Sequence, residues 1–357
     1  MKAIAIFPGQ KNSVHLRDIQ TPDIKANEVL IRSIRCGICG TDREINEGLY
    51  GTAPLKQDYL VLGHESSGIV EKIGDAVSGI AIGDYVVRSV RRPCPTCDNC
   101  NHGANDMCTS GNFVESGIKE LNGCMAEYFV DDPAYLIKIN QELAHTSVLL
   151  EPISVVEKAW RQAKAIQQRL YWRPQKALIM GAGPIGLLQA MLLKEEGLDV
   201  AVVARSQEGN LKSTLVRAIG AQYYGTVTTS LDAIKEDFGN IDLIVEASGS
   251  AAMAFEAMNL VGLNGVVCLT SITGGKGDIK IPADKINLDY VLGNKVVFGT
   301  VNANLCDYQR GVHRLEKFMS RWPEVVEQIF TRRVPLSQYL EAFRSLSEDI
   351  KTTIEFS

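Results

Sequence analysis

The sequence predicts an α/β protein in which a β-rich domain is followed by a doubly wound parallel sheet. Three observations lead to this prediction. The 357 residues suffice for about two domains. The first third contains short apolar runs separated by glycine turns, and beyond residue 150 strand-like and helix-like segments alternate. We expect a first domain over 1–155, a second over 156–300, and a segment over 301–357 that returns to the first.

In the first third, short strands are expected where apolar and β-branched residues cluster between turns. The expected strands are Ala3–Phe7, Glu28–Ile34, Gly68–Ile73 and Asp84–Val90. Many short strands with glycine turns are typical of a small barrel or sandwich.

After residue 150 the pattern changes to helices alternating with apolar strands. Helices are expected over Ile153–Leu170, Leu187–Glu196, Leu211–Ile219 and Asp307–Arg321. Strands are expected over Lys176–Met180, Asp199–Ala204, Ala221–Tyr224, Ile241–Glu246, Val266–Thr270 and Val296–Thr300. Because strands joined through helices usually pair in parallel, these segments predict one doubly wound sheet. A last strand, Thr352–Phe356, is expected to return to the first domain.

Composition argues against several classes of protein. Hydrophobic residues make up 45% and charged residues 22% of the chain, as in ordinary globular proteins. The formal net charge of −5 provides no basic field for nucleic acid or an anionic membrane. The longest apolar stretch, Ala177–Leu193, is interrupted by a glycine turn and therefore predicts a strand and a helix, not a membrane span. Because Met1–Pro8 lacks a secretory pattern, a cytoplasmic protein is expected.

Four of the nine cysteines, Cys94, Cys97, Cys100 and Cys108, are separated by gaps of two, two and seven residues. Four thiolates this close can surround one Zn²⁺ tetrahedrally and order a lobe over about 91–110. An iron–sulfur cluster is the rival, but the bacterial ferredoxin pattern has a final gap of three residues followed by proline. Here the gap is seven and Thr109 follows, so a structural zinc is expected.

A second metal site is suggested by Cys39, His64 and Glu151. A cysteine, a histidine and a carboxylate can hold a catalytic zinc that keeps one position free for substrate. Taken singly, each residue has an ordinary interpretation: a cysteine is often a small buried hydrophobe, and a glutamate before proline often lies on the surface.

The motif Gly181-Ala-Gly183-Pro184-Ile185-Gly186 follows an expected strand and opens an expected helix. In this context it predicts a dinucleotide-binding loop, in which the helix N-terminus faces the phosphates. An acidic residue about 20 positions later would bind the ribose of NAD. The second strand ends instead in Arg205 and Ser206, and a guanidinium there suits the 2′-phosphate of NADP. NADP is therefore expected, with NAD also accepted, although an arginine at a strand end can simply be solvated.

The chain resembles the zinc-dependent branch of the medium-chain dehydrogenase/reductase superfamily. The resemblance rests on CGICGTD (36–42), GHESSGIV (63–70), GDAVSGIAIGDYVV (74–87), the four-cysteine lobe, Glu151-Pro152 and the glycine loop. It implies a GroES-like catalytic domain with a zinc lobe, and a Rossmann domain. It also implies catalytic zinc ligands at Cys39, His64 and Glu151, with Glu65 beside them. Thr41 would take the substrate proton, and Asp42 would orient the site.

Five short segments resemble the glucose 1-dehydrogenases of archaea and some bacteria. These segments are residues 91–93, 115–118, 123–127, 151–159 and 299–304. By this resemblance the sugar would be bound by Thr41, Glu65, Glu115, Glu151 and Asn302. The residues that would approach the cofactor are Gly181, Gly183, Pro184, Ile185, Gly186, Arg205, Ser206, Thr270, Ser271, Ile272, Thr300, Val301, Asn302 and Lys351. Val155 departs from members that carry Asp or Asn there, which leaves the preferred aldose open.

The resemblance thus implies oxidation of an aldose, D-glucose first, at C1 to a lactone. Galactose and pentoses are further candidate substrates. Alternatives are a zinc-dependent polyol or alcohol dehydrogenase of the sorbitol or galactitol type, a zinc-free reductase, and a non-catalytic protein that binds nucleotide or zinc. A homo-oligomer, dimer or tetramer, is expected, with Val291–Gly299 as the joining edge.

Overall fold

The computed structural model describes residues 1–273 and 277–356. The chain forms two compact units. Unit 1 comprises Met1–Ser154, Asn302–Arg321 and Val326–Ser357, and unit 2 comprises Val155–Val301 and Trp322–Val325. Among the described residues, no helix has both the length and the apolar character that crossing a membrane requires.

Unit 1 is built on a seven-stranded sheet whose path runs β11-β6-β5-β3-β19-β18, with β10 also paired to β3. The strands are β3 (Val29–Ile38), β5 (Glu65–Ile73), β6 (Tyr85–Arg88), β10 (Tyr128–Asp131), β11 (Leu136–Ile139), β18 (Phe330–Pro335) and β19 (Lys351–Glu355). The central strand β3 is paired along both edges, and it is mostly buried because its side chains, including Val29, Ile31 and Ile38, pack into the hydrophobic core of this unit.

Two smaller sheets and several helices complete unit 1. The sheets contain β1 (Lys2–Ile6), β2 (His15–Asp18) and β4 (Leu60–Val61), and β7 (Arg91–Arg92), β8 (Val114–Ser116) and β9 (Glu120–Leu121). The helices include α1 (Gly40–Asn46), α2 (Asp98–Asn101), α9 (Leu305–Arg321) and α11 (Tyr339–Phe343). Two further helices, α3 (Leu150–Ile166) and α10 (Pro323–Ile329), contain residues of both units.

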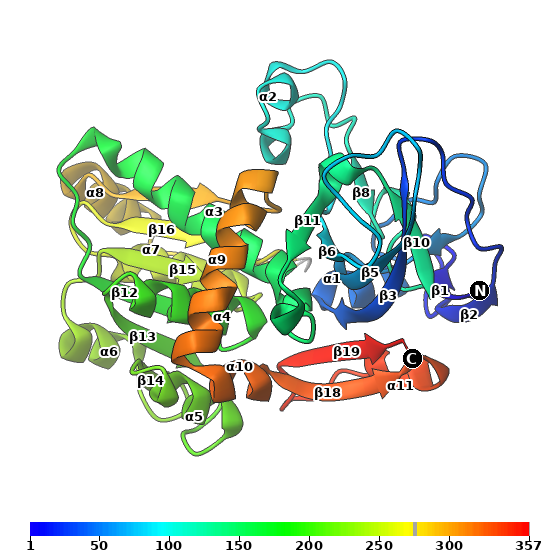
Figure 1. Cartoon of the computed structure of the whole chain (residues 1–357). Helices are drawn as coiled ribbons and strands as arrows, with labels where there is room; N and C mark the ends of the chain where they lie inside the picture. The colour runs from blue at the N-terminus through cyan, green and yellow to red at the C-terminus, as the bar shows by residue number, and fades with distance from the viewer. Residues whose placement is uncertain (274–276, 357) are drawn as a thin grey trace. The chain divides into compact units, whose positions relative to one another are not determined.

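The C-terminal strands lie side by side, orange and red in Figure 1. β19 pairs antiparallel with β3, placing Thr352 opposite Ile38. The sequence pattern did not predict β18. This strand is the edge of its sheet and carries adjacent charged residues, Arg332 and Arg333, which hide the alternation of a half-buried strand.

Unit 2 contains the doubly wound parallel sheet that the sequence predicts, in the order β14-β13-β12-β15-β16-β17. Its strands are β12 (Lys176–Met180), β13 (Asp199–Ala204), β14 (Gln222–Gly225), β15 (Leu243–Glu246), β16 (Val266–Leu269) and β17 (Val296–Gly299). Its helices include α4 (Pro184–Glu195), α5 (Leu211–Ala218), α6 (Leu231–Phe238), α7 (Ala251–Leu260) and α8 (Ala283–Gly293). The strand order reverses beside β12, and ligands of such sheets bind at the carboxyl ends there.

Candidate active site

Cys39 lies where β3 ends and α1 begins. Its Sγ accepts a hydrogen bond from Thr41 N at 3.2 Å and caps the helix. The Asp42 carboxylate in turn accepts a hydrogen bond from Cys39 N at 3.0 Å. These reciprocal bonds fix both the thiol and the carboxylate at the start of α1.

His64 and Glu65 bring an imidazole and a carboxylate to this thiol. Cys39 Sγ lies 3.0 Å from His64 Nε2, and the ligand atoms of Cys39, His64 and Glu65 all lie within 4.8 Å of one another. Glu65 pairs across the ladder with Gly37, where an added Cβ would come within 1.8 Å of Glu65 Oε2. Glycine at position 37 therefore leaves the space that the Glu65 carboxylate occupies.

Lys351 from β19 neutralises Glu65. Its Nζ lies 2.6 and 2.7 Å from the two carboxylate oxygens, and both side chains are buried. Burial alone would lower the pKa of Lys351, but the charge of Glu65 outweighs it and raises that pKa. This ion pair was not predicted from the sequence, since its partners are 286 residues apart.

Glu151 lies in the first turn of α3 and is partly accessible. Burial, together with the charges of Glu65 and Asp42, raises the pKa of Glu151 to about 7, while His64 and Lys351 act in the opposite direction. Glu151 thus senses the charges of His64 and Glu65, but its carboxylate is not among the ligand atoms of Cys39, His64 and Glu65 that lie within 4.8 Å of one another.

The electrostatics of the imidazole fit a bound cation. Burial alone would lower the pKa of His64, but Cys39 and Asp42 raise it well above its ordinary value. His64 Nδ1 lies 3.5 Å from Asp42 Oδ1, and these two buried atoms lack a hydrogen-bond partner within the described residues. A thiol, an imidazole and crowded carboxylates form the donor set that Zn²⁺ prefers, and the cation would relieve their mutual repulsion.

The lobe cysteines form a separate group. The four Sγ atoms of Cys94, Cys97, Cys100 and Cys108 lie within 4.8 Å of one another. Hydrogen bonds from the Ser110 hydroxyl and nearby backbone amides lower the pKa of Cys94 to about 5, and backbone amides lower the pKa of Cys97 to about 7. Burial and the neighbouring thiols raise the pKa of Cys100 to about 12. This crowding of sulfur suits a closed four-thiolate metal site.

The glycine loop of unit 2 has the geometry of an anion cradle. Gly183 caps α4, Pro184 is its first residue, and a Cβ on Gly183 would meet no atom within 4 Å. Gly181 has φ +115, and a Cβ there would lie 2.6 Å from Ala247 O. A Cβ on Gly186 would lie 1.9 Å from Gly181 O. The loop therefore packs tightly inward and leaves its outer side free for a ligand.

The other residues expected at the cofactor are found as follows. Arg205 is exposed after β13, while Ser206 Oγ lies 2.8 Å from Tyr223 Oη. After β16, Thr270 Oγ1 donates to Glu246 O at 2.7 Å and the Ser271 hydroxyl donates to the Glu246 carboxylate. Ile272, Thr300 and Val301 follow the carboxyl ends of β16 and β17, while Asn302 and Lys351 belong to unit 1.

Glu115 and Asn302 meet within unit 1, where Asn302 Nδ2 donates to Glu115 Oε1 at 2.6 Å. Two further residues that contact predicted site residues, Thr41 and Glu115, were not themselves predicted from the sequence. Tyr50 donates to Glu44 at 3.0 Å and also hydrogen-bonds with Thr41, and Arg91 pairs with Glu115 at 2.9 Å. Single residues in loops and short strands carry no periodic signal that would reveal such partners.

Two family models match the chain. The glucose dehydrogenase C-terminus model matches residues 144–356, and the alcohol dehydrogenase GroES-like domain model matches residues 25–141. This chain belongs to the glucose dehydrogenase family. The predicted resemblance to the zinc-dependent medium-chain dehydrogenases and their two-domain fold is thereby confirmed.

Relatives within the glucose dehydrogenase family match over nearly their whole length. Glucose 1-dehydrogenase of Methanocella arvoryzae is 44% identical over 99% of this chain and 99% of that protein. Glucose 1-dehydrogenase 1 of Caldivirga maquilingensis is 40% identical over 100% and 99%. The structure of Haloferax mediterranei glucose dehydrogenase in complex with NADP, Zn and gluconolactone is 31% identical, with a TM-score of 0.92 over 100% of this chain and 99% of that chain. Galactitol-1-phosphate dehydrogenase of Escherichia coli, 21% identical with a TM-score of 0.83, shares the fold alone.

Proposed function

We propose that this protein oxidises an aldose, D-glucose first, at C1 and transfers the hydride to NADP or NAD. The main support for the proposal is the convergence of Cys39, His64 and the buried Glu65 carboxylate in a chain 44% identical to a glucose 1-dehydrogenase. The four lobe cysteines lie close enough to bind one metal as thiolates, and thiols stay reduced in the cytosol, so we propose a cytoplasmic location.

Cys39, His64 and Glu151 would hold the catalytic zinc. Lys351 Nζ already donates to both carboxylate oxygens of Glu65. The Glu151 carboxyl has a raised pKa and no ion-pair partner among the described residues, and this difference favours Glu151 as the third ligand. When bound, zinc supplies Lewis acidity that lowers the pKa of a hydroxyl. The four lobe cysteines would hold a second zinc that orders their loop.

The side chains of unit 1 would bind and deprotonate the sugar. Thr41 would take the proton of the C1 hydroxyl, its position being fixed by the helix cap at Cys39. Glu65, Glu115 and Asn302 would bind further hydroxyl groups, since carboxylates accept and amides both donate and accept. The C1–H bond is lost as hydride and the O–H bond as a proton, so the product is an aldonolactone.

Unit 2 would bind the dinucleotide through its glycine loop and the N-terminus of α4. NADP, when bound, supplies the hydride acceptor. Arg205, with no ion-pair partner among residues 1–273 and 277–356, would pair with the 2′-phosphate. Arg205→Ala should then raise KM for NADP at least about tenfold and leave KM for NAD nearly unchanged, as a charge-assisted bond is worth roughly 1.5–3 kcal/mol. Equal effects on both cofactors would contradict this role.

The experiment that tests the function is a panel of D-glucose, D-galactose and D-xylose with NADP and with NAD. The reduced nicotinamide is followed by absorbance, and the lactone is trapped with hydroxylamine. A ketone product from a polyol would instead identify a sorbitol- or galactitol-type enzyme. Two zinc ions per chain with no turnover of any sugar or polyol would indicate a non-catalytic nucleotide- and zinc-binding protein.

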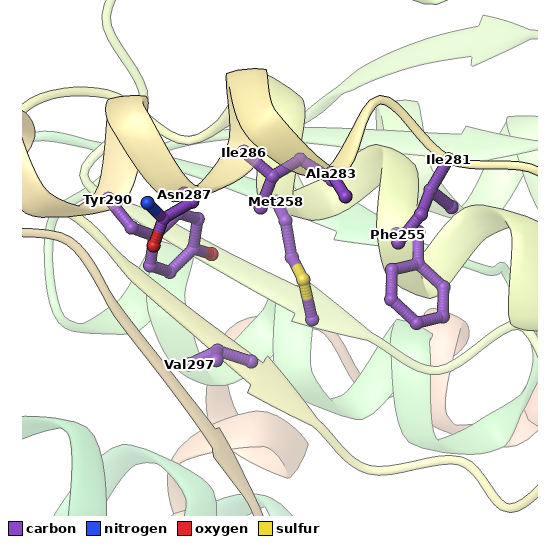
Figure 2. A pocket seen from close by; sticks show the side chains of 8 residues that line it. All are labelled: Phe255, Met258, Ile281, Ala283, Ile286, Asn287, Tyr290 and Val297. Carbon is purple, nitrogen blue, oxygen red and sulfur yellow. The ribbon is translucent and has the colours of Figure 1, made fainter.

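We also propose that two copies join at β17, one of the two edge strands of the described unit 2 sheet. Beside it lies a groove of about 310 Å³ lined mostly by apolar side chains of α7, α8 and β17, together with Ile281 just before α8. Figure 2 shows Met258, Tyr290 and Val297 around this groove. Leu288, Val291 and Leu292 on α8 are more than half exposed, and an exposed apolar edge favours pairing with another strand. Val297→Lys should convert a dimer into a monomer in light scattering, and an unchanged mass would contradict this interface.

A further inference from the structure

Arg91 and Glu115 form a cross-strand pair in unit 1. They stand opposite each other in the β7–β8 ladder, and Arg91 Nε and Nη2 both lie 2.9 Å from Glu115 Oε1. Asn302 Nδ2 donates to the same oxygen at 2.6 Å. Hydrogen bonds from Arg91 Nε and Asn302 Nδ2 and the ion-pair contact of Arg91 Nη2 thus converge on one carboxylate oxygen.

The second carboxylate oxygen of Glu115 is left for another donor. Within the part of the chain that the structure describes, no group donates to Oε2, and 12% of the Glu115 side chain remains accessible. A carboxylate oxygen can accept two hydrogen bonds. Glu115 is therefore held by Oε1 and can receive a hydroxyl at Oε2.

The Arg91 guanidinium is itself fixed on several sides. It stacks on Phe113 at 3.8 Å from the ring centroid, and its Nη1 donates to Asp106 O at 3.2 Å. The backbone oxygen of Arg91 accepts from Asn105 Nδ2 at 2.8 Å. Because the guanidinium is planar and its N–H groups point in fixed directions, Arg91 restricts the Glu115 carboxylate more tightly than a lysine ammonium could.

We propose that Arg91 is a positioning residue for sugar binding, which holds Glu115 Oε1 so that Oε2 accepts a hydroxyl of the aldose. The inference rests on the proposed function, in which Glu115 binds the sugar. Arg91 does not touch the substrate; it removes the rotational freedom that Glu115 would otherwise lose on binding, and such preorganisation increases affinity.

Arg92, the next residue, provides a matched control. It is as buried as Arg91, belongs to the same strand and stacks on an aromatic ring, Tyr135, at 4.1 Å. Its guanidinium pairs with Asp131 instead of Glu115. A lysine at position 92 therefore perturbs a buried arginine–carboxylate pair while leaving the Glu115 contacts intact.

The test compares Arg91→Lys, Arg92→Lys, Glu115→Gln and the double variant Arg91→Lys/Glu115→Gln as zinc-loaded full chains. We expect Arg91→Lys to raise KM for D-glucose about tenfold while kcat changes less than about twofold, with NADPH affinity by fluorescence unchanged. Arg92→Lys should leave KM for glucose unchanged. In the Glu115→Gln background, Arg91→Lys should add little, because both act through one carboxylate.

Phe113→Leu gives a milder version of the same test, should Arg91→Lys lower the melting temperature. It removes the ring under the guanidinium but keeps the ion pair, and KM for glucose should rise two- to threefold. An unchanged KM in Arg91→Lys, the same increase in Arg92→Lys, or additive effects with Glu115→Gln would overturn this inference alone. A wild-type protein that turns over no sugar would overturn the proposed function together with it.

Discussion

The two groups of metal-binding side chains differ in how much of the chain each one requires. The lobe thiols come from a single stretch, residues 94–108. The group at Cys39 draws on the β3–α1 junction, the start of β5 and, through Lys351, on β19. A structural metal site that orders one loop can be built from cysteines close together in sequence. A catalytic site needs several kinds of side chain, and here the strands of the sheet bring them together from distant parts of the chain.

The two groups also differ in how their charge is balanced. In the lobe, hydrogen bonds favour the thiolate forms of Cys94 and Cys97, but among the described residues no lysine or arginine donates a hydrogen bond to the four sulfurs. At Cys39 the protein supplies its own cation, Lys351, against Glu65. The lobe should therefore depend on its metal for stability, while the Cys39 group should remain folded without one.

Cys100→Ser removes one lobe thiolate and tests whether the lobe depends on its metal. Structural zinc contributes on the order of 10 kcal/mol to the ordering of such sites, so the variant should lose one zinc per chain and its lobe should become sensitive to protease. Zinc analysis and mass-mapped trypsin cleavage provide the measurement. A lobe that stays resistant without its metal would show that packing orders it.

Cys39→Ala makes the opposite change. Turnover of glucose should fall at least about a thousandfold, equivalent to roughly 4 kcal/mol of transition-state stabilisation. The melting temperature should fall only slightly, since the loss of the cap on α1 costs about 1 kcal/mol. The affinity for NADPH should stay close to that of the wild type, because unit 2 is untouched. Zinc content, calorimetry and NADPH fluorescence test this expectation, and undiminished turnover would refute the zinc mechanism.

Lys351→Met tests whether the Lys351 ammonium compensates the buried charge of Glu65. A buried carboxylate left without its partner costs about 3 kcal/mol or more, so the free energy of unfolding should fall by that amount. Lys351→Met/Glu65→Gln should recover most of the loss, since the remaining side chain is neutral. Denaturant titration of both variants measures the difference, and an equal loss in the double variant would mean that Lys351 acts through packing alone.

Ser110→Ala gives the smallest expected effect. The Ser110 hydroxyl lies 3.4 Å from Cys108 Sγ and lowers the pKa of Cys94, so its loss should cost about 1 kcal/mol of metal-bound stability. Competition with a chromogenic zinc chelator should show a few-fold weaker affinity at the lobe. No change would indicate that the backbone amides alone hold the thiolates.

The features predicted from the sequence are those encoded within a few neighbouring residues. Strands β12 and β13 have the bounds that their apolar runs predict, Lys176–Met180 and Asp199–Ala204. The cysteine spacing and the glycine motif are equally local. The Glu65–Lys351 pair depends instead on two strands flanking β3 in a particular register, which irregularities in the β3–β5 ladder adjust. No local pattern encodes that register.

The ion pair between Lys351 and Glu65 also sets an order for synthesis on the ribosome. The main segment of unit 2, Val155–Val301, is continuous in sequence, so its sheet can form while translation continues. Lys351, the counterion of Glu65, is translated 286 residues after Glu65. Until then the nascent β3 and β5 would hold an uncompensated negative charge, so the reactive centre should be the last part of the protein to mature.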